Sequence, residues 1–154
     1  MQKAILLLAN ILLIGCTGTK KASTSDNAGK GDTRTKEVEF LDDQTYYLTE
    51  SANDKTYGYE KGNPVKVGGS KENSGPKNQR RFLNGLLGPN GEQIKYYRAG
   101  SCCGFKTPNG LFDNIGLLDL YKVYWDGSDT LNIYINLYDK GDLMIPVGLT
   151  AKQK

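Results

Sequence analysis

The segment Thr130-Leu-Asn-Ile-Tyr-Ile-Asn-Leu-Tyr138 carries the strongest signal for the fold of this chain. Leu131, Ile133, Ile135 and Leu137 alternate with polar or aromatic residues, so the apolar side chains share one face of an extended backbone. A period of two residues is typical of a strand that is buried on one side. We therefore predict a half-buried β-strand over 130–138.

A second run of aliphatic and aromatic residues, over 117–125, precedes this strand and is separated from it by Asp126-Gly127-Ser128-Asp129. Turn residues between two strand-like runs predict a β-hairpin. Shorter patterns predict further strands over 44–48, 56–60, 64–67, 93–98 and 143–149. Pro146 would place the last of these at a sheet edge or a bulge, because proline has no N–H to donate.

One segment has the periodicity of a helix. Phe82, Leu83, Leu86 and Leu87 form one apolar stripe on a helix over 77–87, and Gly88-Pro89 predicts where that helix ends. One short helix against mainly antiparallel strands is an α+β arrangement. We therefore predict an α+β fold, a mainly antiparallel β-sheet with one short helix, in a single small domain.

The N-terminal residues have the parts of a secretory signal peptide. Lys3 precedes an apolar run over 4–14, which ends in Leu13-Ile-Gly-Cys16. A membrane-spanning helix needs roughly 20 apolar residues, about twice the length of this run. The ending resembles the lipobox of bacterial lipoproteins, in which the cysteine after the cleavage site carries a diacylglyceryl thioether. The resemblance implies a lipoprotein signal peptide over 1–15 and a lipidated Cys16.

Residues 17–36 contain no aromatic and no large aliphatic residue. Such a segment cannot bury enough apolar surface to offset the entropy lost on ordering. We therefore predict that residues 16–36 are the lipidated cysteine and a flexible tether, and that the globular domain spans 37–154. Acidic residues directly after the cysteine resemble a surface-export signal in such lipoproteins. Their absence after Cys16 predicts the periplasmic face of the outer membrane.

The excess of positive charge belongs to the tether. Residues 17–36 carry a net charge of +3, whereas residues 37–154 carry 14 Lys or Arg against 15 Asp or Glu. A domain without net positive charge lacks the usual electrostatic signature of a nucleic-acid binder, so we expect no nucleic-acid partner. The tether lysines either contact anionic lipid beside the anchor or keep a linker soluble.

The chain has no histidine, which is the commonest general base and metal ligand. If Cys16 is lipidated, only Cys102 and Cys103 are left, and adjacent cysteines complete neither a metal site nor a disulfide scaffold. We therefore predict no metal site and no cofactor.

Gly100-Ser-Cys-Cys-Gly-Phe105 is the most unusual local motif, and we take Cys102, Cys103 and Arg98 as a candidate functional loop. Both thiols could be structural, one buried and one partly exposed. They could form a vicinal disulfide, which the spacing of about 3.8 Å between adjacent Cα atoms disfavours. One could also be a reactive nucleophile or metal ligand, in which case Arg98 or Lys106 would have to lower its pKa.

Two further features suggest binding. Arg80 and Arg81 at the start of the predicted helix are a candidate site for a carboxylate or phosphate; alternatively, they are a solvated first turn or pair with acids of the domain. The chain also has 10 tyrosines, many of them in predicted strands. Outward-facing tyrosines offer rigid contact area to a glycan or an envelope protein, although cross-strand pairing within the sheet would also explain them.

Motifs along nearly the whole domain resemble a family of small envelope lipoproteins of Bacteroidota-type bacteria. They are Thr56-Tyr-Gly-Tyr59, Asn63-Pro-Val-Lys-Val-Gly-Gly69, Gly75-Pro-Lys-Asn-Gln-Arg-Arg-Phe-Leu-Asn84, Gly88-Pro-Asn-Gly91, Tyr97-Arg-Ala-Gly-Ser-Cys-Cys103, Gly116-Leu-Leu-Asp119 and Leu131-Asn-Ile-Tyr-Ile-Asn-Leu-Tyr-Asp139. The resemblance implies no catalytic residue. Family members often carry the label 2-dehydro-3-deoxyphosphooctonate aldolase, whose enzyme resembles a (β/α)8 barrel of about 250 residues. Because residues 37–154 are too few for that barrel and their strands look antiparallel, we expect the label not to describe an activity here.

The sequence thus predicts a lipid-anchored envelope lipoprotein whose domain is a non-enzymatic binding or accessory module, with an envelope protein or a glycan as its partner. The alternative is a thiol-dependent redox or sugar-acid enzyme that uses Cys102 or Cys103. A purely structural spacer, with no ligand and no partner, is the third interpretation.

Overall fold

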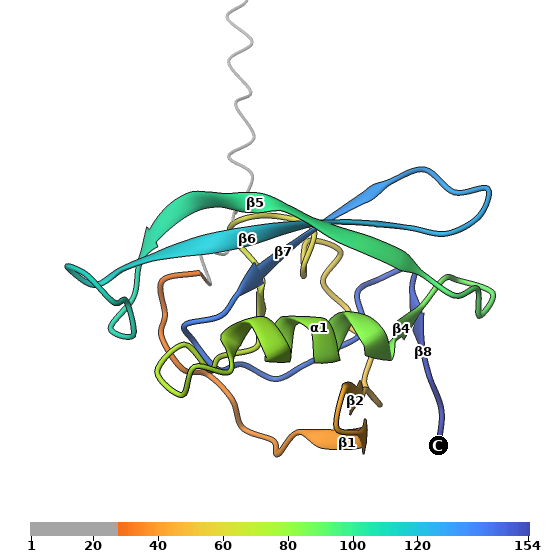
Figure 1. Ribbon diagram of the computed structural model, residues 1–154, viewed down its shortest axis with the longest axis horizontal. Coiled ribbons are helices and arrows are strands. Elements are labelled where there is room, and N and C mark those ends of the chain that lie inside the picture. Colours follow the sequence, from red (N-terminus) through yellow and green to blue (C-terminus); the bar gives the residue numbers. More distant parts are fainter. Residues whose placement is uncertain (1–27) are drawn as a thin grey trace, which may run out of the picture.

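The structure, a computed structural model, describes residues 28–154. The predicted signal peptide, Cys16 and residues 17–27 lie outside the described residues. A four-stranded sheet in the order β3-β7-β6-β5 forms the upper layer of the molecule in Figure 1. Its strands are β3 (Val65–Lys66), β5 (Lys95–Lys106), β6 (Ile115–Tyr124) and β7 (Leu131–Asn136). β5, β6 and β7 pair antiparallel, and β3 runs parallel to β7.

The predicted hairpin is confirmed as β6 and β7. Val123 pairs with Leu131, Tyr121 with Ile133 and Asp119 with Ile135. Ile133 and Ile135 are completely buried, as their place on the apolar face of the alternating segment predicts. The turn between the strands uses Gly127 in a left-handed conformation, with φ of 82°.

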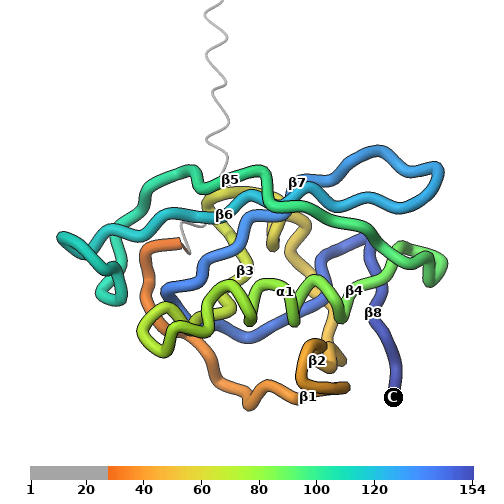
Figure 2. Tube along the Cα trace, viewed as in Figure 1, coloured from red at the N-terminus to blue at the C-terminus, as the bar shows by residue number. Residues whose placement is uncertain are grey.

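The helix α1 (Gly75–Gly85) covers one face of this sheet (Figures 1 and 2). Phe82 and Leu83 are completely buried and pack in one core cluster with the inward-facing residues of β6 and β7. Pro76 lies in the first helical turn, where its fixed φ and missing N–H cost nothing. The mainly β, α+β architecture with one helix is therefore as predicted.

The helix begins and ends two residues earlier than predicted. Leu86 and Leu87 leave the helix and form β4 (Leu86–Leu87), which pairs antiparallel with β8 (Thr150–Ala151). The backbone N–H of Lys152 also donates to the carbonyl of Gly85 at 2.9 Å. Pairing with the C-terminal segment thus overrides the helical periodicity at this end.

Two predicted strands are wrong. Residues 56–60 form turns, because the Asp54 carboxylate accepts from the Thr56 N–H at 2.8 Å and Gly58 is left-handed, with φ of 77°. Within 143–149, Ile145 forms only an isolated bridge with Ser51. The predicted strand at 44–48 is confirmed as β2 (Thr45–Tyr47), which pairs with β1 (Glu39–Asp42) below the helix (Figure 1).

Residues 28–36 belong to the folded domain, which corrects the predicted tether. Ala28 is buried, and Arg34 donates through Nε to the carbonyl of Gly141 at 2.8 Å. The backbone N–H of Thr35 donates to the Asp142 carboxylate at 2.7 Å. The segment lacks large apolar side chains, but hydrogen bonds to backbone carbonyls and to the carboxylates of Glu50 and Asp142 hold it in place. Among residues 28–154, no helix is long and apolar enough to cross a membrane.

Candidate binding groove

A hollow of about 550 Å³ lies between α1 and the strands β5 and β6, and four tyrosines line it. We call it the tyrosine groove. It is lined by Tyr96, Tyr97, Tyr121 and Tyr138 together with Pro76, Gln79, Arg80, Arg98, Ser101, Leu117, Asp119 and Leu137. Its volume is within the range of small-molecule sites. Three of the tyrosines come from the neighbouring strands β5 and β6, but Tyr121 is buried and meets Tyr96 edge to face, which fits the cross-strand alternative for this pair.

A bulge in β5 brings two polar side chains onto the groove side of the sheet. Arg98 pairs with Tyr121 and Ser101 with Asp119, and the register shifts between Arg98 and Gly100. In a regular strand, side chains three residues apart point to opposite faces. The extra residue of the bulge puts Arg98 and Ser101 on the same face. Gly100 has a φ of 148°, which glycine tolerates far better than other residues.

Buried Gln79 and Asp119 form the floor of the groove. Nε2 of Gln79, on α1, donates to Oδ2 of Asp119, on β6, at 2.8 Å. Oε1 of Gln79 accepts from the hydroxyl of Tyr121 at 2.9 Å. Gln79 therefore connects helix to sheet through both ends of its amide. A buried network of this kind is favourable only when every member has a partner, and here each one does.

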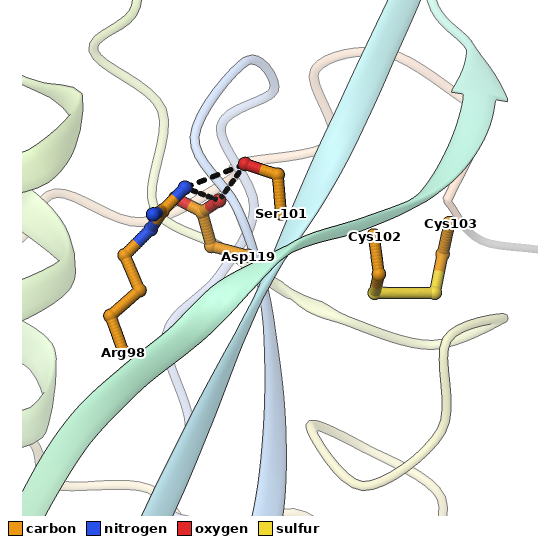
Figure 3. Close-up of a disulfide and its surroundings, with 5 residues drawn as sticks. All are labelled: Arg98, Ser101, Cys102, Cys103 and Asp119. Atoms are coloured by element: carbon orange, nitrogen blue, oxygen red, sulfur yellow. Dashed lines mark hydrogen bonds and ion pairs between the residues drawn. A yellow bond between two sulfur atoms is a disulfide. The ribbon is translucent and has the colours of Figure 1, made fainter.

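The other oxygen of Asp119 holds the cationic side of the groove (Figure 3). Nη2 of Arg98 donates to Oδ1 of Asp119 at 2.7 Å, and the Ser101 hydroxyl donates to the same oxygen at 2.8 Å. The Asp119 side chain is 6% exposed and that of Arg98 is 46% exposed. The hydrogen bond that Arg98 donates to Asp119 raises the pKa of Arg98 above its usual value. Asp119 thus fixes the position of the Arg98 guanidinium, and part of that group remains accessible from the groove.

The tyrosines present both rings and hydroxyls. Tyr96 and Tyr121 meet edge to face, with ring centroids 6.1 Å apart, and the Tyr96 hydroxyl donates to Oδ1 of Asn84 at 2.7 Å. Burial raises the pKa of both tyrosines above its usual value. Tyr97 is 55% exposed and offers its ring to solvent.

The structure separates the two arginines that we took as one candidate anion site. Arg81 pairs with Asp43 at 3.0 Å and lies over the rings of Phe40 and Tyr46, so it holds α1 against β1 and β2. Arg80 is exposed and lines the tyrosine groove. Within residues 28–154, Arg80 has no hydrogen-bond or ion-pair partner. Arg80 and Arg98 are therefore the two cations of the groove.

The cysteine pair lies outside the groove, further along β5 than Arg98 and Ser101 (Figure 3). Cys102 and Cys103 form a vicinal disulfide, one of the three alternatives that the sequence left open. Cys103 is the extra residue of a second bulge, with φ of 54°, and it lines a separate hollow with Phe105 and Lys106. The structure therefore does not bring the candidate loop of Cys102, Cys103 and Arg98 together as one site. Each sulfur is bonded to the other, so a thiolate mechanism would first require reduction.

The polar side chains at the floor of the groove are held by one another. Both oxygens of Asp119 accept hydrogen bonds, and the Ser101 hydroxyl donates one of them. In the described part of the chain, no three His, Cys, Asp or Glu side chains are grouped so that they could hold a metal ion.

Sequence reasoning missed Gln79, Ser101 and Asp119, which organise the groove. Asp119 had a detectable signal, because it interrupts the otherwise apolar start of β6 and a carboxylate in such a run needs a partner. Gln79 and Ser101 had none, since only the helix position and the bulge bring them to Asp119. No protein-family model, curated protein or solved structure matches this chain.

Proposed function

We propose that this protein is a lipid-anchored lipoprotein of the bacterial envelope whose domain binds an acidic glycan in the tyrosine groove. The sequence of residues 1–16 supports the anchor, as does its resemblance to a lipobox. One observation carries the choice of ligand: Arg80 and Arg98 line the same open groove as four tyrosines.

The chemistry of the lining matches a sugar that carries carboxylates or phosphates. Tyrosine combines a broad apolar ring with a polar hydroxyl, so it can contact both the C–H face and the hydroxyls of a sugar. Arginine presents a planar array of N–H donors that fits an anionic oxygen pair. Only Nη2 of Arg98 donates to other described residues, so its remaining N–H groups are available to a ligand.

The network beneath the groove supports binding rather than turnover. Gln79, Asp119 and Tyr121 hold one another in fixed positions, so the site does not have to order them when a ligand arrives. Preorganisation of this kind lowers the entropic cost of binding. The proposed module therefore recognises its glycan without changing it covalently.

Calorimetry with two matched sugars tests the ligand class. We expect the protein to bind oligogalacturonate and to bind galactose oligomers, which lack the carboxylates, at least tenfold more weakly, a difference of about 1.4 kcal/mol. Arg80→Gln should weaken binding of the acidic sugar. Tyr124→Ala is the control, because Tyr124 lies in β6 but does not line the groove. Equal affinity for the two sugars, or no binding of either, would refute the ligand class.

The anchor is tested separately by the intact mass of protein extracted from bacterial membranes. The proposal expects a chain that begins at Cys16 and carries the added mass of acyl chains. A Cys16→Ser variant should keep residues 1–15 and carry no acyl mass. An unmodified Cys16 in the wild-type protein would refute the anchor.

A further inference from the structure

The hairpin between β5 and β6 ends in an apolar tip that the groove does not explain. We define the hairpin tip as residues 107–115. Within it, Leu111 is 58% exposed, Phe112 82% and Ile115 46%. Figure 1 shows this end of the sheet projecting beyond the helical layer, at the left of the view. Neighbouring exposed apolar side chains of this size are typical of a surface that contacts a membrane, a protein or a ligand.

The backbone holds these side chains outward. Phe112 pairs with Ile115 across a two-residue turn, and the Ile115 N–H donates to the Phe112 carbonyl at 2.8 Å. Asp113 and Asn114, at the centre of that turn, have φ values of 49° and 56°. Two successive left-handed residues define a type I′ turn, which matches the twist of the flanking strands. Phe112 is thus exposed on a defined turn.

A buried carboxylate anchors the base of the tip to the domain. Asp139 is completely buried and accepts hydrogen bonds from the Thr107 hydroxyl and from Nδ2 of Asn109, the latter at 2.9 Å. Nδ2 of Asn109 also donates to Asp32 at 2.8 Å. The base of the tip is therefore fixed to the domain.

The chain enters the described domain at the base of the same hairpin. The backbone of Gly29 lies against the carbonyl of Lys106, and Gly31 lies against the ring of Pro108. Residues 17–27 separate Ala28 from Cys16, and an extended chain spans at most about 3.6 Å per residue, or about 43 Å over this separation. A lipid on Cys16 would therefore hold this end of the domain within about 43 Å of the membrane surface.

Basic residues surround the base of the tip. Lys106 pairs with Ile115 in the sheet register, Lys71 donates to Asn109 at 2.9 Å, and Lys30 follows Gly29. The acids of the same region are Asp32, Asp113 and Asp139, of which Asp139 is buried beneath the tip. Lysines flanking an exposed phenylalanine favour an anionic lipid surface, where apolar side chains enter the interface and ammonium groups stay among the headgroups.

We infer that the hairpin tip inserts Leu111 and Phe112 into the interface of an anionic phospholipid membrane and so orients the anchored domain. The inference rests on the lipid anchor of the proposed function. A bilayer is favoured over a second copy of this chain because the chain from the predicted anchor arrives beside the tip and lysines flank it.

Tryptophan fluorescence tests the inference on the lipidated protein, reconstituted into vesicles of phosphatidylethanolamine and phosphatidylglycerol with brominated acyl chains. Bromine quenches tryptophan only at short range. A Trp125→Phe, Phe112→Trp variant should lose at least about half of its emission relative to unbrominated vesicles, since interfacial side chains reach about 5–10 Å into the acyl boundary. The wild-type protein is the control. Its single tryptophan, Trp125, follows the far end of β6, about 30 Å from the tip, and should not be quenched.

The possible outcomes separate the two proposals. Failure of the wild-type protein to float with vesicles overturns the anchor and, with it, the membrane role of the tip. Flotation without quenching of the tryptophan at position 112 overturns the tip alone. A third outcome assigns the tip to a second copy of the chain and also overturns the inference. In that case bromine does not quench the tryptophan at position 112, but its protection from an aqueous quencher increases with the protein-to-lipid ratio.

Discussion

Gln79 and Asp119 join the helix of this domain to its sheet through a buried hydrogen bond of 2.8 Å. Gln79 is 1% exposed and Asp119 is 4% exposed, so neither can replace this partner with bulk water. The same Gln79 amide accepts from Tyr121, and the same Asp119 carboxylate accepts from Arg98 and Ser101. The position of the cationic side of the groove thus depends on a contact in the protein interior.

Gln79→Leu should therefore destabilise the domain strongly. The substitution keeps the volume of the side chain but leaves Oδ2 of Asp119 and the Tyr121 hydroxyl without a partner. An unsatisfied buried polar group costs about 1–3 kcal/mol, so we expect the free energy of unfolding to fall by about 2–4 kcal/mol in urea titrations. Gln153→Leu, at an exposed position near the C-terminus, should change it by less than about 0.5 kcal/mol. A Gln79→Leu protein as stable as the wild type would show that the network is not important for stability.

Two glycines of β5 should respond differently to an added methyl group, because only one of them lies in the first bulge with a positive φ. Gly100→Ala should lower the free energy of unfolding by about 1–2 kcal/mol, because its φ of 148° strains any residue with a Cβ although no atom lies within 4 Å. Gly104→Ala is the matched control. Its added Cβ would make an ordinary contact of 3.7 Å with Leu117, and its φ lies outside the left-handed region. Equal effects of the two substitutions in thermal or urea unfolding would contradict this account.

Much of the fold followed from local patterns. The alternation over 130–138 predicted both β7 and its buried face, and the turn residues after Trp125 predicted its pairing with β6. The stripe that includes Phe82 and Leu83 predicted the helix and the side that it buries. These signals are local because neighbouring residues set both the period of two and the period of a helix.

Features that depend on distant partners could not be predicted. The strand β5 extends to Lys106, well past the predicted end at 98, because β6 pairs with it along its whole length through two bulges. Residues 28–36 look disordered by composition but are ordered by acceptors at Lys140, Gly141 and Asp142, more than a hundred residues away. The groove also depends on distant partners. Gln79, Ser101 and Asp119 come into contact only when α1 packs on the sheet and the bulge turns Ser101 toward Asp119.

The attachment of residues 28–36 should depend on pH through Asp142. Partial burial opposes ionisation of this carboxyl, but the N–H and hydroxyl of Thr35 and the N–H of Lys36 outweigh it, so the pKa of Asp142 is lowered. A lowered folded-state pKa stabilises the domain fully above the unfolded pKa of about 3.9, and this contribution is lost as the pH falls through the folded pKa.

In an NMR titration, the amide signals of Thr35 and Lys36 should therefore keep their shifts at neutral pH and move only below about pH 3.9. Asp142→Asn should abolish this transition, since an amide does not titrate there. A midpoint at or above that of an unperturbed aspartate would contradict the assignment.

Cys103 has a strained backbone conformation, and a glycine at this position should relieve the strain. Cys103 has a φ of 54° in the second bulge, where a side chain clashes with its own backbone. Both variants carry Cys102→Ser, so that neither can form the disulfide. In this background, Cys103→Gly should be more stable than Cys103→Ser by about 0.5–1 kcal/mol. Glycine relieves the backbone strain, and this gain exceeds the cost of the greater conformational entropy that glycine gives the unfolded chain. Ala99→Gly is the control of opposite sign. Ala99 lies in the same strand without a positive φ, so glycine there should lower stability by about 0.5–1 kcal/mol. If glycine destabilises both positions in urea titrations, the bulge does not constrain Cys103, and the pair can take up another conformation at no cost.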